Sequence, residues 1–188
     1  MSKPTESQKE LYKKLSPILG VDSKVVRYGD DNNDKSIFIL ECPDPTDEKV
    51  MFYSTIGLMD FPTDGIKYEI LFTGYSTFEC TGNILSSSAF FVIKDNWKIS
   101  NGVVFETLVE MFLPNNKDMK HVLFTSPFLW EDKLEGFEVQ SEEVLFLLAI
   151  PISDAELQYK NKNGLSALES IFEERNVDIF DLDRASVL

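Results

Sequence analysis

The carboxylates near the end of the chain are the residues whose type and spacing could best support chemistry. Asp178, Asp181 and Asp183 lie close together in the sequence, and grouped carboxylates can act as acid and base or bind a divalent cation. Arg184 directly follows Asp183, an order that instead favours a local ion pair and a capping role. Both interpretations stay open, so a carboxylate-dependent hydrolase or metal-binding enzyme is one candidate function.

Other catalytic chemistry finds little support in the sequence. The chain has one histidine, His121, and two cysteines, Cys42 and Cys80, without the close pairs that zinc sites use. It contains neither a glycine-rich phosphate-binding motif nor the G-x-S-x-G elbow of serine hydrolases. We therefore expect no catalytic residue, no metal and no cofactor, and we interpret both cysteines as free thiols of a reducing compartment.

The charge of the chain narrows the class of partner. The 188 residues include 32 acids and 18 bases, which gives a net charge of −14. Such a chain is repelled by nucleic-acid phosphates and by anionic membrane surfaces, so neither is an expected partner. The longest strongly apolar run, residues 144–152, is far too short to span a membrane. We expect a cytoplasmic protein that attracts a basic protein, unless the acidity serves solubility alone.

The acidic residues are concentrated outside the first forty positions. Residues 41–80 contain eight acids and two bases, and residues 121–188 contain fourteen acids and five bases. Six of the acids fall within residues 131–143, a density typical either of a solvated loop or of an acidic docking edge. The candidate partner-binding residues are Asp44, Asp47, Asp60, Asp64, Asp132, Glu135 and Glu142.

Hydrophobic periodicity and capping signals predict the elements that position these side chains. Period-two patterns predict strands at residues 25–28, 36–42, 50–55, 66–73, 103–105, 121–125 and 143–150, and the last, apolar on both faces, is expected to be central. Spacing of 3.6 predicts a helix from Leu85 with Trp97 extending its apolar face.

Capping signals predict three further helices. An N-terminal helix over about residues 5–16 starts at a capping box and stops before Pro17, because the residue before proline avoids helical geometry. Boxes at Ser153 and Ser166 begin two C-terminal helices. The expected fold class is α+β. It is a single domain over residues 1–188, with a mixed sheet of about six or more strands, a central helix and two C-terminal helices.

Several segments, in this order, resemble suppressor-of-fused-like domains. They are residues 53–60 and 68–72, the helical stretch 85–97, residues 121–124 and 144–152, and the tail positions Glu156, Leu157, Gly164, Leu165 and Leu168. The similarity covers most of residues 25–175. It implies an interaction module without catalysis, because animal members are regulators that bind a transcription factor peptide. Asp60 matches the family's Gly-Leu-x-Asp position, near the region where those members contact their peptide.

Short members of this family are bacterial and are associated with immunity proteins of polymorphic toxin systems. The sequence looks most like the antitoxin that accompanies an LXG-type secreted nuclease toxin. The resemblance thus implies an immunity protein that occludes the basic active surface of a toxin domain. Two alternatives remain: the carboxylate-dependent enzyme, and a regulatory scaffold that binds a peptide by β-augmentation.

Overall fold

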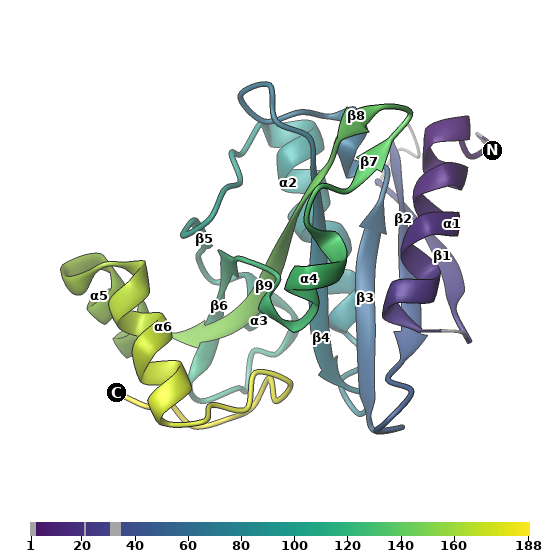
Figure 1. The fold of residues 1–188 in the computed structure, drawn as a ribbon. Helices are drawn as coiled ribbons and strands as arrows, with labels where there is room; N and C mark the ends of the chain where they lie inside the picture. Colours follow the sequence, from purple (N-terminus) through teal and green to yellow (C-terminus); the bar gives the residue numbers. More distant parts are fainter. Residues whose placement is uncertain (1–2, 21, 31–34) are drawn as a thin grey trace.

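A mixed β-sheet forms the centre of the protein in this computed structural model, which describes residues 3–20, 22–30 and 35–188 (Figure 1). Within the described residues the sheet has seven strands in the order β1-β2-β3-β4-β9-β6-β5, and β4 and β9 run parallel. The strands are β1 (Lys24–Gly29), β2 (Ser36–Pro43), β3 (Val50–Ile56), β4 (Tyr68–Tyr75), β5 (Val104–Phe105), β6 (Met119–Thr125) and β9 (Leu145–Ser153). A separate small hairpin joins β7 (Glu138–Val139) to β8 (Glu142–Glu143).

Helices cover both faces of the sheet, so the fold has three layers. They are α1 (Glu6–Leu19), α2 (Thr81–Asp95), α3 (Leu108–Phe112), α4 (Glu131–Leu134), α5 (Asp154–Asn163) and α6 (Leu165–Glu174), with 3₁₀ turns at Leu58–Asp60 and Phe128–Trp130. Figure 1 shows α1 and α4 in front of the sheet and α2 and α3 behind it. The predicted α+β single-domain fold is confirmed. Of the helices described, none is both long and apolar enough to cross a membrane.

Strand alternation divides the buried side chains into two cores. Leu71 of β4 packs in the core that includes Leu11, Leu15 and Leu19 of α1. Its neighbour Ile70 packs in the core beneath α2. This alternation follows from the period of two along a strand.

Strand β9 is the predicted central strand, and every residue after Leu145 is buried. It pairs with β4 on one side and with β6 on the other. Helices then cover both of its faces, which explains its continuous apolar sequence.

The first helix continues past Pro17, so the predicted stop at residue 16 is wrong. The capping box between Thr5 and Gln8 forms as predicted, but the helix ends at Leu19. Proline lacks an amide hydrogen and leaves the carbonyl of Lys13 without its helical donor. Lys13 is exposed, so water can reach that carbonyl, and the buried Leu19 anchors the last turn one turn beyond Leu15.

Other helix boundaries also differ from the prediction, and α2 begins at Thr81, before the predicted start at Leu85. Asn96 adopts a left-handed conformation and ends α2, so Trp97 lies outside the helix and stacks on Phe91 with ring centroids 4.4 Å apart. Helix α6 begins at Leu165 after Gly164, and Ser166 makes no capping bond. The box at Ser153 and Glu156 is confirmed at the start of α5.

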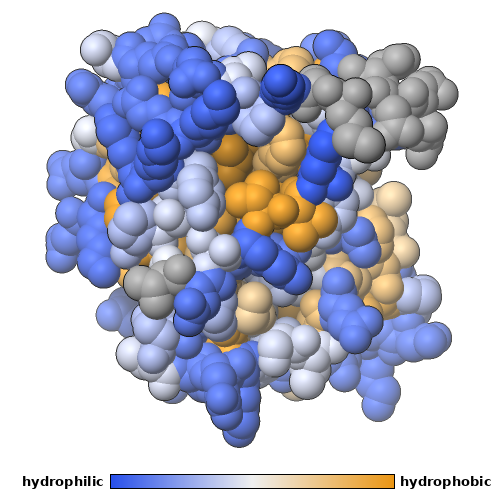
Figure 2. Space-filling view, turned by 90° about the vertical axis from the view of Figure 1, so that its right-hand side faces the viewer, coloured by the Kyte–Doolittle hydropathy of each residue, from blue (hydrophilic) through white to orange (hydrophobic). Residues whose placement is uncertain are grey.

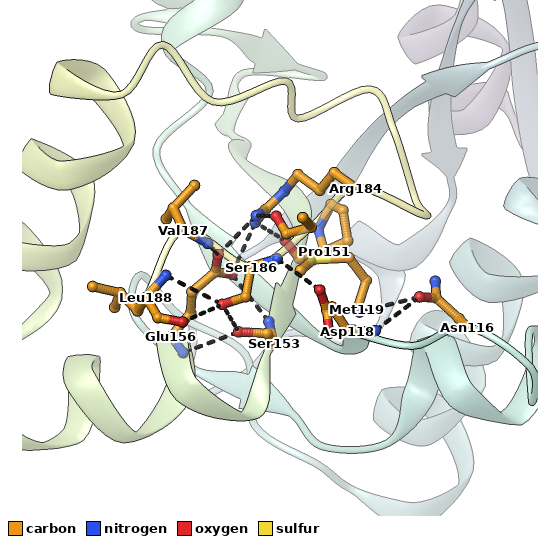
Figure 3. Close-up of polar contacts among 11 residues, drawn as sticks. Asn116, Asp118, Met119, Pro151, Ser153, Glu156, Arg184, Ser186, Val187 and Leu188 are labelled. Carbon is orange, nitrogen blue, oxygen red and sulfur yellow. Dashed lines mark hydrogen bonds and ion pairs between the residues drawn. The ribbon is translucent and has the colours of Figure 1, made fainter.

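Arg184 forms a buried ion pair with Glu156, not the predicted local pair with Asp183 (Figure 3). Its Nη1 and Nη2 donate to the two carboxylate oxygens of Glu156 at 2.7 and 2.8 Å, and Nη2 also donates to the carbonyl of Pro151 at 2.9 Å. The Glu156 side chain is fully buried, so its charge needs compensation inside the protein, and Arg184 supplies it from 28 residues further along the chain.

The C-terminal segment is held to the sheet by further polar contacts. The amide of Ser186 donates to Asp118 at 3.0 Å, and the side-chain amide of Asn116 donates to the carbonyl of Leu182. Leu182 itself is fully buried in the core beneath α2. The tail therefore packs against the lower end of the sheet (Figure 1), and Figure 3 shows its polar contacts.

Arg184→Met is expected to lower the free energy of unfolding by roughly 3–5 kcal/mol, because it leaves the Glu156 carboxylate buried without its cation. Urea denaturation of the purified variant measures this loss. Lys9→Met, which removes the exposed Glu6–Lys9 pair, is the control and should leave the midpoint unchanged. The double variant Arg184→Met/Glu156→Met should recover much of the loss, and a single variant as stable as the wild type would contradict the assignment.

Candidate partner-binding surface

The carboxylate of Glu69 organises the loop that follows β3. Glu69 lies in β4 and is fully buried, and its Oε1 accepts hydrogen bonds from the amides of Gly57 and Met59 at 2.8 and 3.1 Å. The hydroxyl of Thr55 donates to the other carboxylate oxygen. Burial raises the pKa of Glu69 to about 8, although these hydrogen bonds oppose the rise. The side chain thus fixes the backbone of residues 57–59 from inside.

Gly57 and Gln8 set the position of Asp60 in this loop. Gly57 has a φ of 109°, and a Cβ there would lie 2.5 Å from Nε2 of Gln8, so the turn requires glycine. The same Nε2 donates to Asp60 at 3.2 Å, while Oε1 of Gln8 accepts from the amide of Thr5 at 3.1 Å. The capping box of α1 therefore also holds the exposed carboxylate of Asp60.

A groove of about 390 Å³ lies between this loop and the end of α2. Its lining residues are Asp60, Phe61, Pro62, Thr63, Asp64, Val92, Ile93, Asn96, Trp97 and Lys98. Trp97 is 41% exposed and is supported from behind by Phe91. Asp64 pairs with Lys98 at 2.7 Å. The groove combines an exposed aromatic ring with carboxylates.

The β7–β8 hairpin brings more acids to the same end of the sheet. Glu138, Glu142 and Glu143 are exposed, whereas Val139 between them is buried and anchors the hairpin. Glu142 forms an ion pair with Lys67, next to the loop that carries Asp64. The hairpin therefore adds exposed carboxylates beside this loop.

The seven predicted partner-binding residues therefore fall into separate groups. Asp60, Asp64 and Glu142 lie at the acidic end, and the exposed Asp132 and Glu135 lie on and just after α4. We call the set Asp60, Asp64 and Glu142, together with the groove, the acidic end.

Asp44 and Asp47 lie in the turn before β3, at the opposite end of that strand (Figure 1). The carboxylate of Asp44 is turned back onto its own loop, where it accepts from the amide and hydroxyl of Thr46 at 2.6 and 2.7 Å. Burial alone would raise the pKa of Asp44, but these hydrogen bonds and one from Asp47 lower it overall. The role of these two residues in binding stays a prediction.

The aspartates near the chain end make structural contacts in the loop after α6. Asp178 accepts the hydroxyl of Tyr75 at 2.7 Å and the amide of Phe180 at 3.0 Å, and Asp181 accepts the amide of Asp183 at 2.8 Å. The hydrogen bond to Asp178 raises the pKa of Tyr75 to about 12, with burial as the second cause. In the described ranges, His, Cys, Asp and Glu side chains form no group of three that could hold a metal ion.

The single histidine and the two cysteines are spread over different parts of the fold. His121 is buried, with Nδ1 accepting the Thr107 amide at 2.9 Å and Nε2 lying 3.0 Å from Asp154. Cys42 is buried and Cys80 half-buried, and both are free. Burial raises the pKa of the Cys42 thiol to about 11, so its nucleophilic thiolate is scarce at neutral pH.

Sequence reasoning missed three parts of this surface: Glu69, Gln8 and the groove wall at Trp97 and Lys98. An acid within the apolar run of β4 is a visible signal for Glu69, because a buried carboxylate needs partners. The capping box identifies Gln8 only as part of the start of α1, and no local pattern predicts its contact with Asp60, 52 residues away.

Comparison with known proteins finds one family model and one named relative that match this chain. The model of the family described as "Suppressor of fused protein (SUFU)" matches residues 33–185. One relative, named immunity protein YqcF, comes from Bacillus subtilis and is 36% identical over 190 residues, covering 98% of each chain.

Three solved structures share the fold at low sequence identity. A SUFU homologue from Neisseria gonorrhoeae has a TM-score of 0.66 at 17% identity, covering 97% of both chains. A chain of a Sufu–Fu complex has a TM-score of 0.71 at 12% identity, covering 98% of this chain and 93% of that one. Drosophila Suppressor of Fused has a TM-score of 0.58 at 12% identity, covering 81% of this chain and 43% of its own.

Glu69→Gln is expected to flatten the pH dependence of stability. The pKa of Glu69 is raised in the folded chain from 4.5 to about 8, so the folded state keeps a proton that the unfolded state releases. The wild type should therefore lose roughly 1 kcal/mol per pH unit, relative to the Gln variant, as the pH rises between these values.

Urea denaturation at pH 5, 6.5 and 8 measures this difference. Glu79→Gln, the same substitution at an exposed carboxyl, is the matched control and should follow the wild type. Parallel curves for the wild type and Glu69→Gln would show that Glu69 does not carry the raised pKa.

Proposed function

This chain belongs to the suppressor of fused (SUFU) family, and we propose that it is an immunity protein that binds and neutralises a toxin. The observation that carries the proposal is the 36% identity, over nearly the whole of both chains, to a relative named an immunity protein. In this role the protein acts by binding and not by catalysis. The structural contacts made by Asp178 and Asp181 leave the hydrolase alternative without support of its own.

The proposed mechanism is occlusion of a basic toxin surface by the acidic end. A toxin domain that handles nucleic acid must attract phosphates, so its active surface carries positive charge. A protein with a net charge of −14 is drawn to such a surface over the screening length, and this attraction raises the association rate. A secreted nuclease toxin is therefore the partner that fits best.

The groove supplies a place for one basic side chain of the toxin. A guanidinium or ammonium group over the ring of Trp97 is favoured by the ring's negative face. The carboxylate of Asp60, held by Gln8 on the rim, adds a charge-assisted hydrogen bond. The charges of the acidic end then steer the approach of the toxin, and the groove fixes the orientation of the toxin in the complex.

The immunity role is tested by rescue of toxin-expressing cells. The toxin to test is the C-terminal domain of a secreted toxin whose gene adjoins the gene for this protein. Cells that make this domain should survive when they also make the wild-type protein, and the two purified proteins should form a complex. Cell death despite full expression of the protein, with no complex in solution, would overturn the immunity role itself.

Charge reversal at the acidic end is expected to slow association. The triple variant Asp60→Lys/Asp64→Lys/Glu142→Lys should lower the association rate constant at low salt by about tenfold or more, because steering depends on local opposite charge. Stopped-flow mixing at several salt concentrations measures the rate, and the wild-type rate should fall steeply with salt.

The matched control reverses three exposed acids elsewhere, Glu173→Lys/Glu174→Lys/Asp183→Lys, and changes the net charge equally. Equal slowing in both triple variants would show that total charge and not the acidic end steers the encounter. A second set, Asp132→Lys/Glu135→Lys, tests α4, and Asp47→Lys tests the opposite end of β3. Unchanged binding and rescue in all these variants would overturn the acidic-surface mechanism while leaving the immunity role standing.

A further inference from the structure

Strand β1 forms one edge of the main sheet, on the side of the molecule away from β5. All six of its residues pair with β2, from Lys24 opposite Glu41 to Gly29 opposite Ser36. Within the part of the chain that the structure describes, no strand pairs with the other side of β1. An edge strand of this length presents a row of backbone donors and acceptors to solvent.

The surface around β1 is more apolar than the rest of this side. Figure 2 looks at the molecule from the side of α1 and β1 and shows hydrophobic surface at its centre, bordered by hydrophilic side chains. Val25 is 44% exposed, and Val26 is half-buried. The two valines point to opposite faces of the sheet, because their partners Leu40 and Ile39 belong to different cores.

Arg27 is a cation on this edge that has no ion-pair partner among the described residues. It is half-buried opposite Phe38, and its buried Nε has no hydrogen-bond partner. Lys24 on the same strand, by contrast, pairs with Glu41 at 2.9 Å. No carboxylate of the described residues pairs with this half-buried guanidinium, so it can bind an anion that a partner supplies.

We propose that β1 is a second interaction edge, which accepts an extended segment of a partner protein carrying a carboxylate that pairs with Arg27. The backbone of the segment adds a strand to the sheet, its apolar side chains cover Val25 and Val26, and its carboxylate faces Arg27. This edge differs in chemistry from the acidic end, since β1 contains two bases and no acid. The β1 edge therefore binds a partner segment that differs from the basic surface bound by the acidic end.

A second copy of this chain is a poorer occupant. Two antiparallel β1 strands place Arg27 opposite another residue of this edge, and β1 contains no acid, so pairing within β1 supplies no carboxylate. The register that places the two Arg27 residues opposite each other also brings like charges together, which is destabilising across strands. Each copy also has a net charge of −14, so the two copies repel.

The probe is an eight-residue peptide of alternating Thr and Val with one Glu at its centre, and the control peptide has Lys in place of that Glu. Amide hydrogen exchange of the full chain should show added protection in β1 with the Glu peptide. Fluorescence anisotropy should show at least tenfold weaker binding of the Lys peptide. Arg27→Glu should reverse this preference, and its thermal midpoint verifies that the variant folds.

Lack of binding by either peptide at millimolar concentration would overturn the proposal, as would equal binding of both to the wild type. Protection outside β1 and β2 would overturn it as well. Concentration-dependent dimers in light scattering, with added amide protection in β1 at the concentrations where they form, would assign the edge to a second copy instead. None of these readouts involves a toxin, so they stand apart from the test of the immunity role.

Discussion

The parallel pairing of β4 with β9 is the constraint on which the rest of the fold depends. These two strands lie at the centre of the sheet and are buried on both faces, so helices must cover both sides. This pair also places Glu69 and Glu156, the two carboxylates of the described residues that are fully buried. Glu69 lies within β4, and Glu156 lies in the first turn of the helix that follows β9. One organises the loop at the acidic end, and the other fixes the C-terminal segment at the opposite end.

The cost of burying a carboxylate is compensated in different ways at Glu156 and at Glu69. Glu156 is paired with a guanidinium, a capping amide and the amide of Val187. Glu69 has hydrogen-bond donors but no cation among its contacts, and its pKa rises to about 8. The first arrangement keeps a charge in the interior by compensating it, and the second favours a neutral acid. The loop that carries Asp60 thus depends on a group whose protonation changes near neutral pH.

Much of the fold could be predicted from local patterns, and the errors have physical causes. Periodicity located the long strands and the central position of residues 143–150, and capping boxes located the starts of α1 and α5. Pro17 led to a wrong helix end because Lys13, whose carbonyl loses its helical donor, is an exposed residue, and the helix tolerates the missing bond. The pairing of Arg184 was missed because its partner lies 28 residues away. The grouping of the seven acids was also not predicted, because it depends on strand direction, which the composition of the chain does not determine.

The ion pairs of the acidic end make binding at Asp64 and Glu142 an exchange reaction. Lys98 already neutralises Asp64, and Lys67 already neutralises Glu142. A cation that binds Asp64 or Glu142 must displace the resident lysine, so the number of ion pairs there is conserved and the net gain is small. Cations that merely match the charge gain little from this competition. Cations that present a planar, bidentate group or fill the space beside Trp97 gain more. The resident lysines therefore make the acidic end selective among basic surfaces.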